Sequence, residues 1–169
     1  MKHIVIIVIL FITFQSCNNT SEKDEFENIN WSARVATVNN LDSLEIGKSY
    51  LSIYSQIYSL SQHKKYNLTV MTSLRNTSVK DTIYLFKADY YDTHGELIKT
   101  YIRKPVYMLP METLDIVIKE ADITGGTGSN FIFDWKAPKD CPEPIFEAVM
   151  SSTVGSQGLS FTTQGKRID

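Results

Sequence analysis

Hydrophobic and polar residues alternate along most of the chain after residue 48. Leu114, Ile116 and Ile118 alternate with polar neighbours, and Phe131, Phe133 and Trp135 do the same. Successive side chains of a β-strand point to opposite faces of the sheet, so this alternation predicts strands with one buried face. No stretch of residues 31–169 carries an apolar stripe of helical period and length. The pattern therefore predicts an all-β protein.

The alternating segments are short and separated by Gly, Pro, Asn and Asp. They cover residues 49–59, 66–76, 82–91, 96–102, 106–109, 114–119, 131–136, 145–153 and 159–164. Strands of this length at near-regular spacing predict a β-sandwich of about eight strands, immunoglobulin-like or fibronectin-like. Pro105 and Pro110 bracket Val106 to Leu109, which is typical of an edge strand. Trp135 shares parity with Phe131 and Phe133, so we expect these three side chains to line one inner face.

The N-terminus has the anatomy of an export signal. Ile4 to Phe14 is apolar except for Thr13 and ends at Gln15-Ser16-Cys17. Eleven helical residues span about 16 Å, too short for a bilayer core of about 30 Å, which favours a signal peptide over an anchor. A small residue before Cys17 resembles the lipobox of bacterial lipoproteins. That resemblance implies cleavage before Cys17 and acylation of its thiol and new amine, with palmitate among the usual chains.

The lipobox resemblance has two departures and one alternative. Phe14 stands where Leu is usual, and Gln15 stands where a small residue is usual. The alternative is an ordinary secretory signal with an incidental cysteine. Two or three acyl chains hold a protein firmly on a membrane, whereas a single chain binds marginally.

This interpretation divides the chain into residues 1–16 as signal peptide, 17–30 as lipidated cysteine and acidic tether, and 31–169 as one domain. Asn18 stands where Asp favours retention in the inner membrane, so we expect a lipid-anchored protein of the cell envelope, at the outer membrane. The acidic cluster of the tether resembles a surface-export tag, although a solvated linker is the better explanation. Residues 31–38 form either a short first strand or a docked arm.

Composition narrows the class of protein. The 169 residues are 43% hydrophobic and 21% charged, as in an ordinary globular protein. A formal net charge of −2 excludes a strongly basic nucleic-acid binder. If Cys17 carries lipid, then Cys141 has no disulfide partner. No histidine lies near Cys141 in the sequence to activate it, so we expect no catalytic thiol.

Catalytic chemistry is sparse. Zinc motifs and a nucleophile elbow are absent from the sequence, and we expect no metal and no cofactor. Asp89, Asp92 and His94 cluster around one turn that Gly95 closes. Such a cluster suits either a solvated hairpin or a hydrolase or glycan-active site.

A glycine-rich stretch is the most unusual local feature. Gly125, Gly126 and Gly128, followed by Asn130, can bring backbone amides close to an anion or a peptide. A P-loop would need a lysine and a following helix, and Phe131 begins a strand instead. The stretch is either a bulged β connection or a small binding loop. Tyr50, Tyr54 and Tyr58 share strand parity, which suits either half-buried strands or a stacking surface for sugars or peptides.

The order of these motifs resembles a known family. The quoted segments are Tyr50–Tyr58, Tyr66–Thr77, Asp89–Gly95, Thr124–Phe131 with Trp135, Glu147–Met150 and Gly158–Phe161. Together they resemble the bacterial domain of unknown function 3124 family over residues 49–166. The resemblance implies a bacterial, exported and often lipid-anchored single domain, with no activity and no catalytic residues to transfer.

Three functions follow as hypotheses. The leading one is a non-catalytic envelope lipoprotein that binds another envelope protein or a glycan. Its candidate binding residues are Gly125, Gly126, Gly128, Asn130, Asp89 and Asp92. The rival is an envelope hydrolase or glycan-active enzyme that uses Asp89, Asp92 and His94. The third is a purely structural or assembly role. If the turn and the glycine loop converge in one concave pocket, the enzyme gains support.

Overall fold

The computed structural model describes residues 29–37, 43–153 and 158–169, and these residues form an all-β domain. Twelve strands follow one 3-10 turn in the described part of the chain. The elements are η1 (Trp31–Arg34), β1 (Leu44–Ile53), β2 (Gln56–Ser59), β3 (Ser61–Asn67), β4 (Thr69–Arg75), β5 (Ile83–Tyr91), β6 (Leu97–Ile102), β7 (Val106–Met108), β8 (Thr113–Ile118), β9 (Ser129–Pro138), β10 (Ile145–Ser152), β11 (Leu159–Gln164) and β12 (Lys166–Arg167). The predicted all-β class is confirmed.

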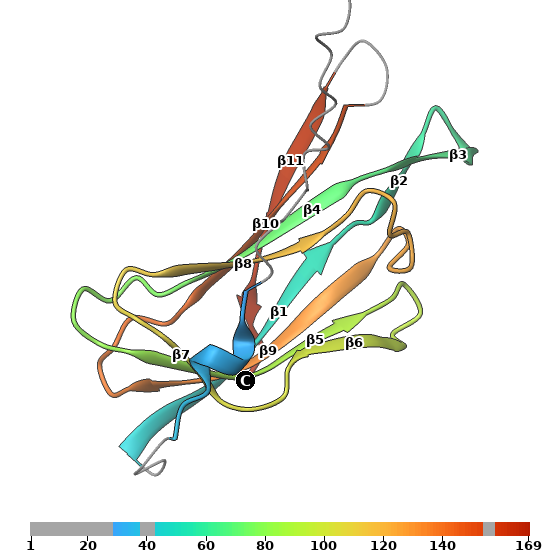
Figure 1. Cartoon of the computed structure of the whole chain (residues 1–169). Helices are drawn as coiled ribbons and strands as arrows, with labels where there is room; N and C mark the ends of the chain where they lie inside the picture. The colour runs from blue at the N-terminus through green and yellow to red at the C-terminus, as the bar shows by residue number, and fades with distance from the viewer. Residues whose placement is uncertain (1–28, 38–42, 154–157) are drawn as a thin grey trace, which may run out of the picture.

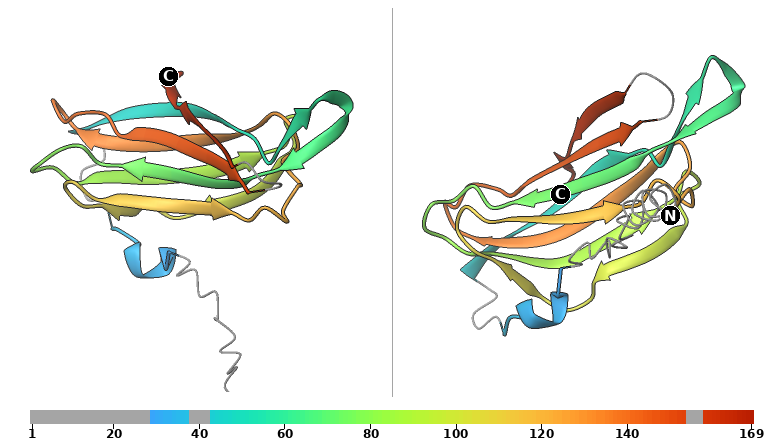
Figure 2. Two further views of the ribbon diagram at one scale, coloured as in Figure 1. Left: turned by 90° about the horizontal axis from the view of Figure 1, so that it is seen from above. Right: turned by 45° about the horizontal axis from the view of Figure 1, so that its top comes forward.

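The strands form two main sheets and a ribbon (Figure 1). The first sheet has the order β12-β1-β9-β5-β6, with β7 also pairing β5, and the second has the order β11-β10-β4-β8. The strands β2 and β3 pair only with each other. Figure 2 shows the two sheets stacked as layers, which confirms the predicted sandwich. The pairings of β4 with β8 and of β5 with β9 interleave as the B–E and C–F pairs of immunoglobulin sandwiches do.

The number of strands exceeds the predicted eight or so for a local reason. The segment predicted as one strand over residues 49–59 divides at Tyr54 and Ser55 into β1 and β2. The segment predicted as one strand over residues 66–76 divides at Leu68 into β3, which already begins at Ser61, and β4. Lys166–Arg167 adds β12. Val106–Met108 pairs with β5 as the predicted edge strand.

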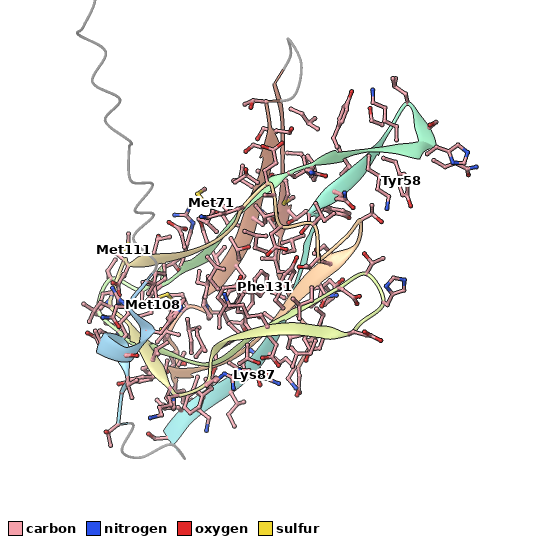
Figure 3. The ribbon with its side chains drawn as sticks, turned by 45° about the vertical axis from the view of Figure 1, so that its right-hand side comes forward. Tyr58, Met71, Lys87, Met108, Met111 and Phe131 are labelled. Carbon is pink, nitrogen blue, oxygen red and sulfur yellow. The ribbon has the colours of Figure 1, made fainter. Side chains whose placement is uncertain are left out.

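The core is built around β9, which lies between β1 and β5. Phe131, Phe133 and Trp135 are at most 1% exposed, so the predicted inner face is confirmed. Phe131 stacks on Phe133 with ring centroids 5.4 Å apart, and Phe133 stacks on Phe146 of the second sheet at 4.2 Å. Figure 3 shows Phe131 in the middle of the domain. The buried indole of Trp135 donates a hydrogen bond of 3.0 Å to the hydroxyl of Ser49.

Connections gather at two opposite ends of the sandwich (Figure 1). One end, called the ribbon end, carries the β2–β3 ribbon, the turn of residues 92–96 between β5 and β6, and the loop of residues 119–128 between β8 and β9. The other end, called the arm end, carries residues 76–82, 109–112 and 139–144. The sandwich therefore has two distinct poles.

Residues 31–37 form a docked arm and not a strand of the sheet. Val35 forms an isolated bridge with Val106, and the Ala36 amide donates to the Pro105 carbonyl at 2.8 Å. Arg34 forms an ion pair of 2.6 Å with Glu112. All these contacts fix the arm beside β7, at the arm end.

Other sequence predictions concern residues outside the described ranges. The signal peptide, Cys17 and the acidic tether up to residue 28 belong to this group. Among the described residues, no helix has the length and apolar character needed to cross a membrane.

Candidate functional site at the ribbon end

The turn between β5 and β6 is organised by Asp92. One oxygen of its carboxylate accepts hydrogen bonds of 2.8 Å from the backbone amides of His94 and Glu96. Gly95 supplies the positive φ of 81° that closes the turn. The amide of Glu96 is the main reason why the pKa of Asp92 lies below its usual value. This carboxylate therefore holds the turn in shape.

Asp89 occupies a different surface, the outer face of the first sheet. Its side chain is 2% exposed and accepts from Lys87 at 2.6 Å, Thr100 at 2.7 Å and Tyr91 at 3.2 Å. Burial alone would raise the pKa of this carboxyl, but these donors outweigh it and lower the pKa. Asp89 is thus a satisfied buried anion.

Of the three residues of the predicted hydrolytic cluster, the structure brings His94 to Asp92 and gives Asp89 other partners. Asp89 bonds to Lys87, Thr100 and Tyr91, whereas the ring of His94 lies 3.3 Å from Asp92 and is 83% exposed. Three metal-ligating side chains do not come together anywhere among the described residues. Two cavities, of about 470 and 290 Å³, are lined by other residues, including Trp31 and Tyr101 in one and Ile46 and Phe86 in the other.

The glycine loop is bound to that same turn through Thr93. The amide and the hydroxyl of Thr93 donate to the carbonyl of Gly125, at 3.1 and 2.9 Å. The amide of Gly128 donates in turn to the hydroxyl of Thr93 at 3.0 Å. Thr93 and Gly125 are 32 residues apart in the sequence, and their two motifs therefore form one unit, which we call the Thr93 clasp (residues 92–96 and 123–128).

Close packing explains Gly125 of the clasp. Gly125 is buried, and a Cβ there would lie 2.7 Å from the Ser129 hydroxyl, 2.8 Å from that of Ser55, and closer still to that of Tyr90. Gly126 has a positive φ of 71°. The amides of Gly126 and Gly128 are already bonded, to Ile123 and Thr93. Packing thus accounts for Gly125, and the amides of Gly95, Gly126 and Gly128 in the clasp are not free for an anion, because each already donates within the chain.

The remaining candidates lie at the margin of the clasp. Asn130 is half-buried at the start of β9, where it pairs with Ser52 of β1 and Tyr91 of β5. Tyr50 and Tyr58 lie on different elements because the chain bends between β1 and β2, so the tyrosines of shared parity form no continuous ladder. Cys141 is buried, and burial raises the pKa of its thiol.

Sequence reasoning missed the β2–β3 ribbon, which is the most prominent feature of this end. The polar run from Ser61 to Lys65 lacks alternating apolar residues and lies between the predicted segments 49–59 and 66–76. The structure pairs Tyr58 with Lys65 and Ile57 with Tyr66. The signal that could have revealed the ribbon is weak and consists of Ile57 and Tyr58 on one side of the run and Tyr66 on the other.

Comparison with known proteins places the chain in a family. No curated protein matches it. A solved structure titled "Crystal Structure of Thermotoga maritima 1070" is similar at 10% identity, covering 71% of this chain and 92% of that one, with a TM-score of 0.43. The model of the family described as "Protein of unknown function (DUF3124)" matches residues 46–168, from β1 to the C-terminal strand. The chain therefore belongs to the DUF3124 family.

Proposed function

We propose that this protein is an exported, lipid-anchored envelope protein whose sandwich is a non-catalytic binding module. The lipobox-like Cys17 and the acidic tether support the anchor. The observation that supports the binding role is that the docked arm and the candidate binding elements lie at opposite ends of the domain. The chain enters through the docked arm at one end, while the ribbon and the Thr93 clasp lie at the other. An anchor upstream of the arm leaves the ribbon end available to a partner.

The chemistry of the ribbon end favours binding over catalysis. The Asp92 carboxylate is bonded to the turn, and the Asp89 carboxylate is buried and bonded to three donors. General acid–base catalysis needs a carboxyl group that can reach a substrate proton. Loops fixed on a rigid sandwich commonly carry binding instead.

Lipidation is tested by metabolic labelling with an alkyne fatty acid. We expect wild-type protein to be labelled and to fractionate with the outer membrane, and Cys17→Ala to lose both properties. Persistent labelling of Cys17→Ala would overturn the anchor. The matched control is Cys141→Ala, which removes the buried cysteine and should leave labelling unchanged.

The binding end is tested by photo-crosslinking in the native envelope. A crosslinking residue is placed at exposed His94 of the ribbon end or, as control, at exposed Lys139 of the arm end. We expect a discrete crosslinked species from position 94 and none from position 139. Crosslinks confined to position 139 would place the binding surface at the wrong end and refute the proposal.

A further inference from the structure

The β2–β3 ribbon projects from the sandwich on a fixed base. Gln56 is fixed through both its backbone and its side chain. Its backbone amide donates to the Gly126 carbonyl at 3.0 Å, and its side-chain amide donates to the Asn67 side chain at 2.9 Å. The Leu68 amide donates to the Ser55 carbonyl at 2.9 Å where the two strands separate into the two sheets. Figures 1 and 3 show the ribbon extending past the rest of the domain, with Tyr58 on it. The tip is thus presented to solvent on a rigid support.

The tip exposes one apolar and one aromatic side chain that do not pack against the core. Leu60 is 94% exposed and adopts a positive φ of 62°, a conformation that costs a non-glycine residue energy. Tyr58 is 55% exposed. A single exposed leucine is unremarkable by itself. Its position at the outermost turn, beside an exposed tyrosine, is what requires an explanation.

The ribbon is also a positively charged segment of a chain with negative net charge. Lys64 and Lys65 lie on β3, and their ammonium groups sit 5.2 Å from the rings of Tyr66 and Tyr58. No aspartate or glutamate occurs anywhere between Glu45 and Asp81. The ribbon therefore combines one apolar tip, two tyrosines and two lysines without a compensating acid.

We propose that the β2–β3 ribbon binds the surface of an anionic lipid bilayer. Leu60 enters the interface, the tyrosines lie at the level of the headgroups, and the lysine ammonium groups contact phosphates. A carbohydrate chain would use the tyrosines and lysines but has no use for an apolar tip, which is why the bilayer is the better partner. This inference rests on the proposed binding role of the ribbon end and assigns the ribbon itself to the bilayer, whereas crosslinking at position 94 reports on a partner of the neighbouring Thr93 clasp.

A ribbon contact would act together with the lipid anchor. Once the acyl chains are in a bilayer, contact of the ribbon with the same bilayer is intramolecular, so a weak interaction suffices. Each lysine near an anionic surface is expected to strengthen partitioning about fivefold. The domain would then lie along the membrane, held at the arm end by lipid and at the ribbon end by Leu60 and the lysines.

The experiment isolates the ribbon from the anchor. The chain from residue 18 lacks the leader and Cys17 but retains every described contact, since these begin at Ile29. Circular dichroism establishes that it is folded. It is then co-sedimented with phosphatidylcholine vesicles, with and without phosphatidylglycerol. We expect binding only to the anionic vesicles, and release by high salt.

Two variants and one control test the residues. Replacing Lys64 and Lys65 together by Gln should lower the partition constant roughly 25-fold. Leu60→Ser should also lower it, without changing the charge. The control replaces Lys80 and Lys139 by Gln, two exposed lysines of the arm end, and should bind like wild type.

Several outcomes would overturn the proposal. These are the absence of vesicle binding, equal binding to neutral vesicles, and an equal loss in the control pair. Binding to dextran sulfate that matches vesicle binding and survives Leu60→Ser would identify a polyanion as the partner instead. Because fatty-acid labelling and crosslinking test the proposed function separately, a labelled, crosslinking protein that ignores vesicles refutes the ribbon inference alone.

Discussion

Gly125 lies directly beneath the hydroxyl of Tyr90, so that no side chain fits between the glycine loop and the core. The Tyr90 hydroxyl shares a hydrogen bond of 2.9 Å with that of Ser55, and burial raises the pKa of this tyrosine. A Cβ on Gly125 would displace this pair of hydroxyls. The contact joins the two motifs that resembled family signatures, and it gives both a structural role.

The first prediction compares two glycines of one loop. Gly125→Ala should destabilise the fold by about 1–3 kcal/mol, as overpacking does. Gly128→Ala should change stability by less than about 1 kcal/mol, because its Cβ would meet only Thr93, at 3.5 Å. Urea unfolding measures both. Equal stability of the two variants would contradict the close packing at Gly125.

The second prediction concerns Trp135. Trp135→Ala should cost about 3–5 kcal/mol, because it empties a buried site that also bonds Ser49. The control is Ile132→Ala, a large-to-small change on the opposite face of the same strand, which should cost clearly less. Unfolding midpoints decide the matter. A Trp135→Ala protein as stable as Ile132→Ala would place the indole outside the core.

These two predictions differ in how far the sequence could anticipate them. Strand alternation alone indicates that Trp135 faces inward, because parity is a local property. The neighbour of Gly125 could not be predicted, because it depends on β9 pairing with β5, and no local pattern specifies that pairing. Asp89 and Asp92 are three residues apart, and closeness in the sequence alone predicts that they cluster. Bulges in β5 at residues 88–89 and 90–91 and the turn geometry give them separate roles.

The third prediction is a pH dependence centred on Asp89. Its pKa in the folded state lies below the unfolded value of about 3.9. The carboxylate therefore stabilises the fold above that value, and this contribution is lost as the pH falls through the folded pKa. Asp89→Asn should lower stability at pH 7 and make the decline on acidification shallower.

The control for Asp89 is Asp140→Asn, which removes the same charge from an exposed position. Urea midpoints between neutral and acidic pH should be close to those of wild type for Asp140→Asn. Parallel pH profiles for wild type and Asp89→Asn would show that the bonds from Lys87 and Thr100 contribute nothing to stability.

The fourth prediction uses a buried hydroxyl without a partner. Thr72 is fully buried between Ala148 and Ile116, and its hydroxyl has no hydrogen bond within the described structure. Thr72→Val should stabilise the domain by about 1 kcal/mol, since it removes a desolvated polar group. Thr163→Val is the matched control and should destabilise by a similar amount, because Thr163 donates to the Ser52 carbonyl at 2.6 Å. Thermal unfolding that ranks the two variants in the reverse order would contradict this account.

The central position of β9 has a consequence for when the protein can fold. Trp135 on β9 and Ser49 on β1 are 86 residues apart, and β5 also needs β9 as its neighbour. Pairing across such separations is slow, because the entropy of loop closure is lost before the stabilising contacts between the strands can form. The first sheet cannot close until residues 129–138 arrive, late in synthesis. Under the proposed export, in which the chain crosses a membrane as an extended polypeptide, this delay would keep the N-terminal half competent for translocation until its last strands have followed.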